Sequence, residues 1–142
     1  MKKEYLVGIG PNEIHISVTV GTAGAAASAL FLIAFDSDPV HLPTSGHDNG
    51  AIPETLVGTA QDVRQKILTI HTTIDFGALP ESEWPSAIHT TVVKYTLSGG
   101  TAGTVTFEPE KDDQVLSDNG KIVAYKKHFI FLTITTPFRI QN

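Results

Sequence analysis

One stretch of the sequence decides the fold, namely residues 14–20, Ile14-His15-Ile16-Ser17-Val18-Thr19-Val20. Its apolar side chains alternate with polar ones, which is the period-two pattern of a β-strand with one buried face. The same alternation returns at residues 66–76, where Leu68, Ile70, Ile74 and Phe76 share one face. We therefore expect strands that each bury one face against a second layer.

The stretch lies inside a run of 22 residues, between Glu13 and Asp36, that contains no Asp, Glu, Lys or Arg. Turn residues interrupt this run at Gly21 and Gly24, and its one continuous apolar segment, residues 29–35, is far shorter than the roughly 20 residues of a membrane span. Lys2 and Lys3 supply the positive N-terminus of a signal sequence, but the interior of the run alternates as a strand does, and the acidic Asp36 and Asp38 follow it in place of a basic cluster. We expect no membrane span and no signal peptide, and we favour a cytoplasmic protein over a secreted one.

Strand signals recur along the rest of the chain, because 17 threonines add to abundant Val and Ile. Turn signals at Asp118-Asn119-Gly120 and Ser98-Gly99-Gly100 predict two hairpins. The only helical candidate is a single turn in the alanine-rich residues 23–29. We expect about eight strands, at residues 5–9, 14–20, 29–35, 66–76, 87–98, 104–108, 122–125 and 128–136, with a short ninth near Leu56.

The chain of 142 residues has the length of one domain. Several short strands with frequent turns are typical of a sandwich or a jelly roll. The sequence therefore predicts an all-β fold, a single antiparallel β-sandwich domain over residues 1–142, of jelly-roll or immunoglobulin-like type, with at most one short helical turn.

The charge and the absence of cysteine exclude several classes of function. With no cysteine, the chain has no disulfide, no thiolate zinc site and no cysteine nucleophile. The net charge of −5 gives no basic footprint for nucleic acid. The charge is uneven, since residues 1–117 hold six basic and fourteen acidic side chains, whereas residues 118–142 hold four basic and one acidic. This asymmetry favours either head-to-tail packing of copies or an edge strand guarded by lysines.

The stretch from Asp36 to Thr55 has no periodicity, and loops of this length in small domains are often functional. Carboxylate and amide oxygens suit calcium, whereas imidazoles suit zinc. The alternative is a surface loop whose Asp and Asn side chains cap their own backbone. The predicted metal ligands, for calcium or zinc, are Asp36, Asp38, His41, His47 and Asp48.

Three further residues are candidates for ligand binding. Trp84 is the only tryptophan, and in a loop it would stack on a sugar or anchor a protein partner, or else plug one end of the sandwich. His71 and His89 occupy matching positions in Ile70-His71-Thr72-Thr73-Ile74 and Ile88-His89-Thr90-Thr91-Val92. If these two segments pair as strands, the histidines face each other; otherwise the match is a coincidence in a threonine-rich sheet.

No catalytic motif is present: the sequence has no Gly-x-Ser-x-Gly elbow, no dinucleotide fingerprint and no phosphate loop. We therefore expect a protein that is not an enzyme, an interaction or assembly module that binds a protein partner or packs with copies of itself as a homo-oligomer. The alternative is a carbohydrate- or metal-dependent binding domain that uses the loop from Asp36 to Thr55 together with Trp84. A small hydrolase is the second alternative.

Overall fold

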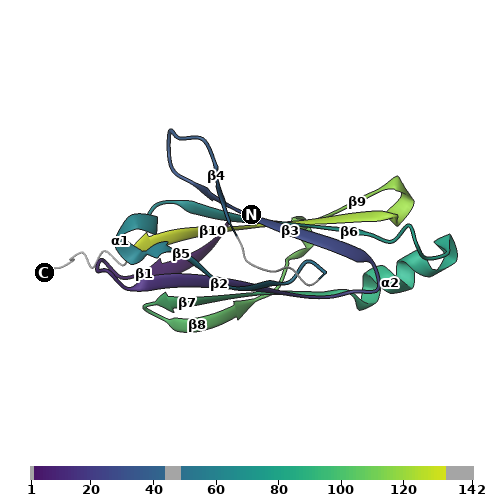
Figure 1. The fold of residues 1–142 in the computed structure, drawn as a ribbon, viewed down its shortest axis with the longest axis horizontal. Helices are drawn as coiled ribbons and strands as arrows, with labels where there is room; N and C mark the ends of the chain where they lie inside the picture. The colour runs from purple at the N-terminus through teal and green to yellow at the C-terminus, as the bar shows by residue number, and fades with distance from the viewer. Residues whose placement is uncertain (1, 44–48, 134–142) are drawn as a thin grey trace, which may run out of the picture.

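Two β-sheets pack face to face in the computed structural model, which describes residues 2–43 and 49–133 (Figure 1). Sheet A has six strands in the order β1-β10-β6-β3-β4, with β9 also paired to β10, and sheet B has four in the order β5-β2-β7-β8. The predicted all-β sandwich is confirmed, with ten strands where about eight were expected. The strands are β1 (Lys2–Val7), β2 (Glu13–Gly21), β3 (Ala25–Ile33), β4 (Val40–Leu42), β5 (Ile52–Thr59), β6 (Ile67–Asp75), β7 (Val92–Gly100), β8 (Gly103–Phe107), β9 (Gln114–Ser117) and β10 (Ile122–Thr133).

The core lies between the sheets and follows the alternation of the sequence. In β2, Ile14, Ile16 and Val18 are buried, and on the facing sheet Leu68 and Ile70 of β6 are buried as well. Residues two apart on a strand point to the same face, so each strand supplies every second side chain to the core. This arrangement leaves the other face of each sheet free to carry polar side chains or a binding surface.

The strand with the most partners in sheet A is β10. It pairs antiparallel with β6 and β9 and parallel with β1, whose Lys2 lies opposite His128. The two separate strands expected at residues 122–125 and 128–136 are one continuous strand through Lys126 and Lys127, described as far as Thr133. On the outer face of this strand, Ile130 is half-buried.

The helices differ from the prediction. Residues 25–29 belong to β3 and do not form a helical turn, whereas Trp84–Thr90 forms helix α2 in place of the first part of the strand expected at residues 87–98. Pro85 lies in the first turn of α2, where its missing N–H costs no hydrogen bond. The other helical segments are α1 (Ala60–Val63) and the 3₁₀ turns η1 (Glu81–Glu83), η2 (Lys111–Asp113) and η3 (Asp118–Gly120).

Both predicted hairpins are confirmed, with β9 and β10 joined through Asn119 and β7 paired with β8. The second hairpin turns two residues later than expected, because Gly100 still pairs with Gly103. Gly99 has a φ of 95° and a Cβ there would contact the backbone carbonyl of Glu13 in β2. These glycines therefore serve close packing of β7 against its neighbours.

None of the helices in the described part of the chain is long and apolar enough to cross a membrane.

Candidate functional site

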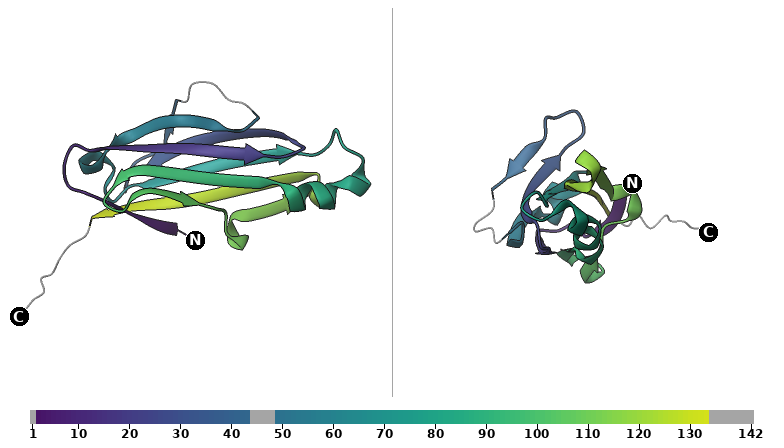
Figure 2. Two further views of the ribbon diagram at one scale, coloured as in Figure 1. Left: turned by 90° about the horizontal axis from the view of Figure 1, so that it is seen from below. Right: turned by 90° about the vertical axis from the view of Figure 1, so that its right-hand side faces the viewer.

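A hairpin formed by β3 and β4 stands out from the body of the sandwich (Figures 1 and 2). Its turn begins where the N–H of Ser37 donates to the carbonyl of Ala34, and Asp36 adopts a φ of 63°. Phe35 at this turn is 88% exposed, and Val40 on the returning strand is 59% exposed. Large apolar side chains this exposed on one projecting element are typical of a contact surface.

The predicted metal ligands are only partly within the described residues. Asp36 and Asp38 lie in the turn of the hairpin, and the ring of His41 packs on Phe31 with centroids 5.3 Å apart, whereas His47 and Asp48 lie outside the described residues. Across residues 2–43 and 49–133, no group of three or more His, Asp or Glu side chains is placed to hold a metal ion. The calcium or zinc site thus stays a prediction.

The end of the same loop has a structural role. The side-chain amide of Asn49 accepts a hydrogen bond from the N–H of Ala26 at 2.9 Å and donates one to the carbonyl of Gly24 at 3.0 Å. Asn49 therefore satisfies backbone hydrogen-bonding groups at the start of β3, where β4 no longer pairs with it, as an Asx side chain does when it replaces a strand partner.

Beside the hairpin, an apolar groove runs over the outer face of sheet A. Ile33, Ile67 and Ile130 lie in register across β3, β6 and β10 and form its floor. The groove consists of two adjoining hollows of about 530 Å³ and 280 Å³, which share Ile33. We call this surface the outer groove; it is lined by Phe31, Ile33, Phe35, Asp36, Asp38, Pro39, Ile67, Thr69, His71, Lys126 and Ile130.

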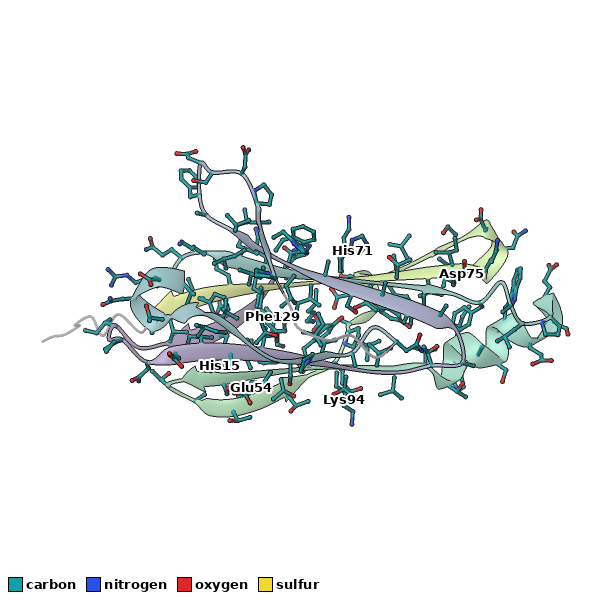
Figure 3. All side chains as sticks on the ribbon, in the orientation of Figure 1. His15, Glu54, His71, Asp75, Lys94 and Phe129 are labelled. Carbon is teal, nitrogen blue, oxygen red and sulfur yellow. The ribbon has the colours of Figure 1, made fainter. Side chains whose placement is uncertain are left out.

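Two histidines lie half-buried on this outer face. Figure 3 shows His71 pointing outward from sheet A, whereas Phe129 lies between the sheets. Burial and the neighbouring Lys126 lower the pKa of His71. Burial also lowers the pKa of His128, with Lys126 and Lys2 adding repulsion and Asp113 opposing it; its Nδ1 lies 2.8 Å from the hydroxyl of Thr69. Both imidazoles therefore favour the neutral form in the folded protein.

The pairing of His71 with His89 is wrong. His71 lies in β6, which pairs with β3 and β10. His89 lies in helix α2, which follows the C-terminal end of β6 in the chain. The matching segments therefore have different secondary structures, and their similarity is a coincidence of composition.

The lowered pKa values give a prediction for stability. A histidine with a lower pKa in the folded state than in the unfolded state stabilises the fold above its ordinary pKa of 6.5, and the contribution is lost as the pH falls below that value. We expect the melting temperature to fall on acidification from about pH 7.5 to about pH 5, and to fall less in His71→Asn. Thermal melts across this range measure the effect, with His89→Asn as a control that keeps the wild-type slope.

Trp84 does not lie near the hairpin. It begins α2, beyond Asp75 at the far end of β6, whereas the outer groove is built on Ile67 at the start of that strand (Figure 1). Its indole N–H donates to the carbonyl of Leu79 at 3.1 Å, and its ring lines a cavity of about 390 Å³ together with Pro85, Ile88, Leu116, Asn119 and Gly120. The structure therefore does not bring Trp84 and the hairpin residues Asp36 and Asp38 into one site, whereas Asn49, later in the same loop, lies at the Asp75 end of sheet A.

A third feature, which the sequence analysis missed, is a buried ion pair inside the sandwich. The ammonium of Lys127 lies 3.0 Å from Oδ2 of Asp113 and 3.6 Å from Oε1 of Glu110. Lys127 and Asp113 are 1% and 2% exposed, whereas Glu110 is half-exposed. Strand parity was the signal that could have found Lys127, because it shares a face of β10 with Tyr125, Phe129 and Phe131.

Two buried oxygen atoms near this pair have no hydrogen-bond partner among the described residues. They are Oδ1 of Asp113 and the hydroxyl of Tyr95. Burial raises the pKa of Tyr95 far above its ordinary value, and the charge of Asp113 raises it further. Native proteins satisfy most buried polar atoms, so two such atoms beside one ion pair mark an unusual place in the core.

Comparison of the chain with protein-family models, with curated proteins and with solved structures gives no significant match, so its function is argued from its own residues.

Proposed function

We propose that this protein is a non-catalytic assembly module that packs with a second copy of itself through the outer groove and the β3–β4 hairpin. The observation that carries the proposal is Phe35, 88% exposed at the edge of an apolar floor. A side chain of this size on a projecting turn contributes little to its own fold, but it is the kind of anchor that dominates protein–protein contacts when a partner covers it.

The charges around the outer groove favour a second copy as the partner. Asp36 and Asp38 lie at the hairpin end of the groove, whereas Lys126 lies at the other end. A two-fold axis through the groove places the acidic end of each copy over the basic end of the other. Symmetric contacts of this kind are the commonest in homo-oligomers, and complementary charge also fixes their register.

Residues on two edge strands favour association through the face of a sheet over association by adding a strand to its edge. The edge strand β1 carries Lys2 and Lys3, and the edge strand β5 carries Pro53 and Glu54. Lysine and proline on edge strands hinder the addition of another strand. The interface that we propose therefore buries side chains of sheet A and does not extend the sheet.

Light scattering coupled to size-exclusion chromatography, run over a dilution series, tests the proposal. We expect the wild-type protein to change from dimer to monomer on dilution, and Phe35→Ser to weaken the association at least about tenfold, which corresponds to ~1.4 kcal/mol. Phe35 is exposed, so its replacement should leave the melting temperature of the monomer nearly unchanged.

A matched control is Leu116→Ser, which replaces a 53% exposed apolar residue beside Trp84 at the opposite end of the sandwich. Its association should equal that of the wild type. A wild-type protein that stays monomeric at high concentration contradicts the proposal. Equal weakening of association by Phe35→Ser and Leu116→Ser would also contradict it, because exposed apolar residues in general, and not the outer groove, would then drive the association.

A further inference from the structure

The pair of Lys127 and Asp113 has the geometry of reactants. Lys127 projects from β10 into the core, and Asp113 reaches it from the end of η2 with 3.0 Å between Nζ and Oδ2. The neighbours of Lys127 on the inner face of β10 are Tyr125 and Phe129, and its partner across to β6 is the fully buried Ile70. An amine and a carboxyl group are thus held in contact in a place that excludes water.

Burial changes the balance between the charged pair and the neutral pair. Two opposite charges lose most of their hydration in this position, which reduces the advantage of the ion pair over a neutral amine beside a carboxylic acid. The neutral amine is a nucleophile, and the protonated carboxyl group is an electrophile with water as its leaving group. One proton moved from Lys127 to Asp113 therefore produces the two reactive forms.

Glu110 is placed to move that proton. Its Oε1 lies 3.6 Å from Nζ of Lys127, and its backbone N–H donates to Oδ2 of Asp113 at 2.6 Å. The side chains of Glu110 and Asp113 also cap each other's backbone N–H groups, which fixes both at the start and end of η2. A carboxylate held 3.6 Å from Nζ acts as a general base that takes up a proton from the attacking amine.

From this geometry we propose that Lys127 and Asp113 join in an intramolecular amide bond, and that Glu110 promotes the reaction. Nζ of Lys127 attacks Cγ of Asp113, and Oδ2 remains as the carbonyl oxygen that accepts the N–H of Glu110. Oδ1, which has no partner among the described residues, leaves with two protons as water. The ammonium and the carboxylate are consumed and one amide and one water are formed, so charge and atoms balance and no oxidant or cofactor is needed.

The bond closes a ring that contains β9, η3 and the first part of β10. It ties the segment that crosses from β8 of sheet B to β9 of sheet A onto β10. A covalent tie restricts the unfolded chain in the same way as a disulfide, and it does so in a chain that has no cysteine.

The intact mass of the purified, folded protein tests the proposal. We expect a mass lower than that of the sequence by one water molecule, and a protease digest in which the peptides of Lys127 and Asp113 stay joined. In Glu110→Gln, which keeps both reacting groups, we expect most of the protein to retain the full mass. Glu108→Gln is the matched control, since Glu108 is an exposed residue two positions earlier, and it should lose water as the wild type does.

Lys127→Arg keeps a cation beside Asp113 and cannot form this amide, so it should show the full mass while remaining folded by circular dichroism. A folded wild-type protein that keeps its full mass overturns the proposal, and so does a loss of water that maps to any other pair of residues. Complete loss of water in Glu110→Gln overturns the role of Glu110.

Discussion

Replacing Lys127 by methionine is expected to lower the free energy of unfolding by ~3–5 kcal/mol, one of the largest effects of any single substitution in this chain. The side chain fits the same space, but the carboxylate of Asp113, 2% exposed, then remains in the core without a cation. Loss of the cation costs the half-exposed Glu110 less, because water still solvates its carboxylate. Urea denaturation followed by tryptophan fluorescence measures the loss, since Trp84 reports on the adjacent end of the sandwich.

The neighbouring lysine is the control for this prediction. Lys126 has the same chemistry but points to the outer face and is exposed, so Lys126→Met should change stability by less than about 0.5 kcal/mol. A double variant, Lys127→Met with Asp113→Leu, also removes the stranded carboxylate and should recover the part of the loss that this charge causes, but not the part due to the lost amide bond. Equal stability of the two single lysine variants would contradict the buried ion pair.

Gly99→Ala is expected to be as damaging, for a reason of backbone geometry. Gly99 has a φ of 95°, which costs an L-residue ~1–3 kcal/mol, and its new Cβ would meet the backbone carbonyl of Glu13 in the neighbouring strand β2. A backbone atom cannot rotate away as a side chain can, so β2 and β7 would have to separate. We expect a loss of several kcal/mol, or a protein that no longer folds at 37 °C, as measured by thermal melting.

Gly103→Ala separates the cost of a positive φ from the cost of the contact with β2. Gly103 also has a positive φ, 80°, but no atom lies within 4 Å of the position of its Cβ. This variant should lose only the ~1–3 kcal/mol of conformational strain. If Gly99→Ala were no worse than Gly103→Ala, the close approach of β7 to β2 would not be a determinant of the fold.

The β-sandwich could be predicted because strand burial is periodic in the sequence. The alternation from Ile14 to Val20 predicts which face of β2 is buried, and the alternation from Leu68 to Phe76 predicts the buried face of β6. The turn signal at Asn119-Gly120 likewise located the β9–β10 hairpin, because few residues other than glycine and asparagine accept a positive φ.

The errors arose where local preference and tertiary context disagree. The alanines of residues 25–29 favour a helix, yet pairing with β6 makes them a strand. Thr90, Thr91 and Val92 favour a strand, which concealed the helix that Pro85 begins. The two adjacent lysines of β10 suggested a break, since no local signal shows that one of them meets a buried carboxylate.

The candidate sites were less predictable than the fold. The stretch from Asp36 was recognised as unusual, and Asp36, Asp38 and His71 do border the outer groove. The groove itself depends on Ile33, Ile67 and Ile130, which lie on three strands and come together only through the register of sheet A. Glu110 and Asp113 escaped notice because a short acidic segment is usually a solvated turn.

The parallel pairing of β1 with β10 sets a time order for folding on the ribosome. Lys2 lies opposite His128, so β1 is synthesised first and its partner follows 126 residues later (128 minus 2), roughly 6–25 s at typical elongation rates. Throughout this interval the backbone of β1 lacks the strand that it pairs with in the finished sandwich. The nascent chain must therefore keep β1 from aggregating until β10 emerges, and sheet A closes only after β10 has been translated.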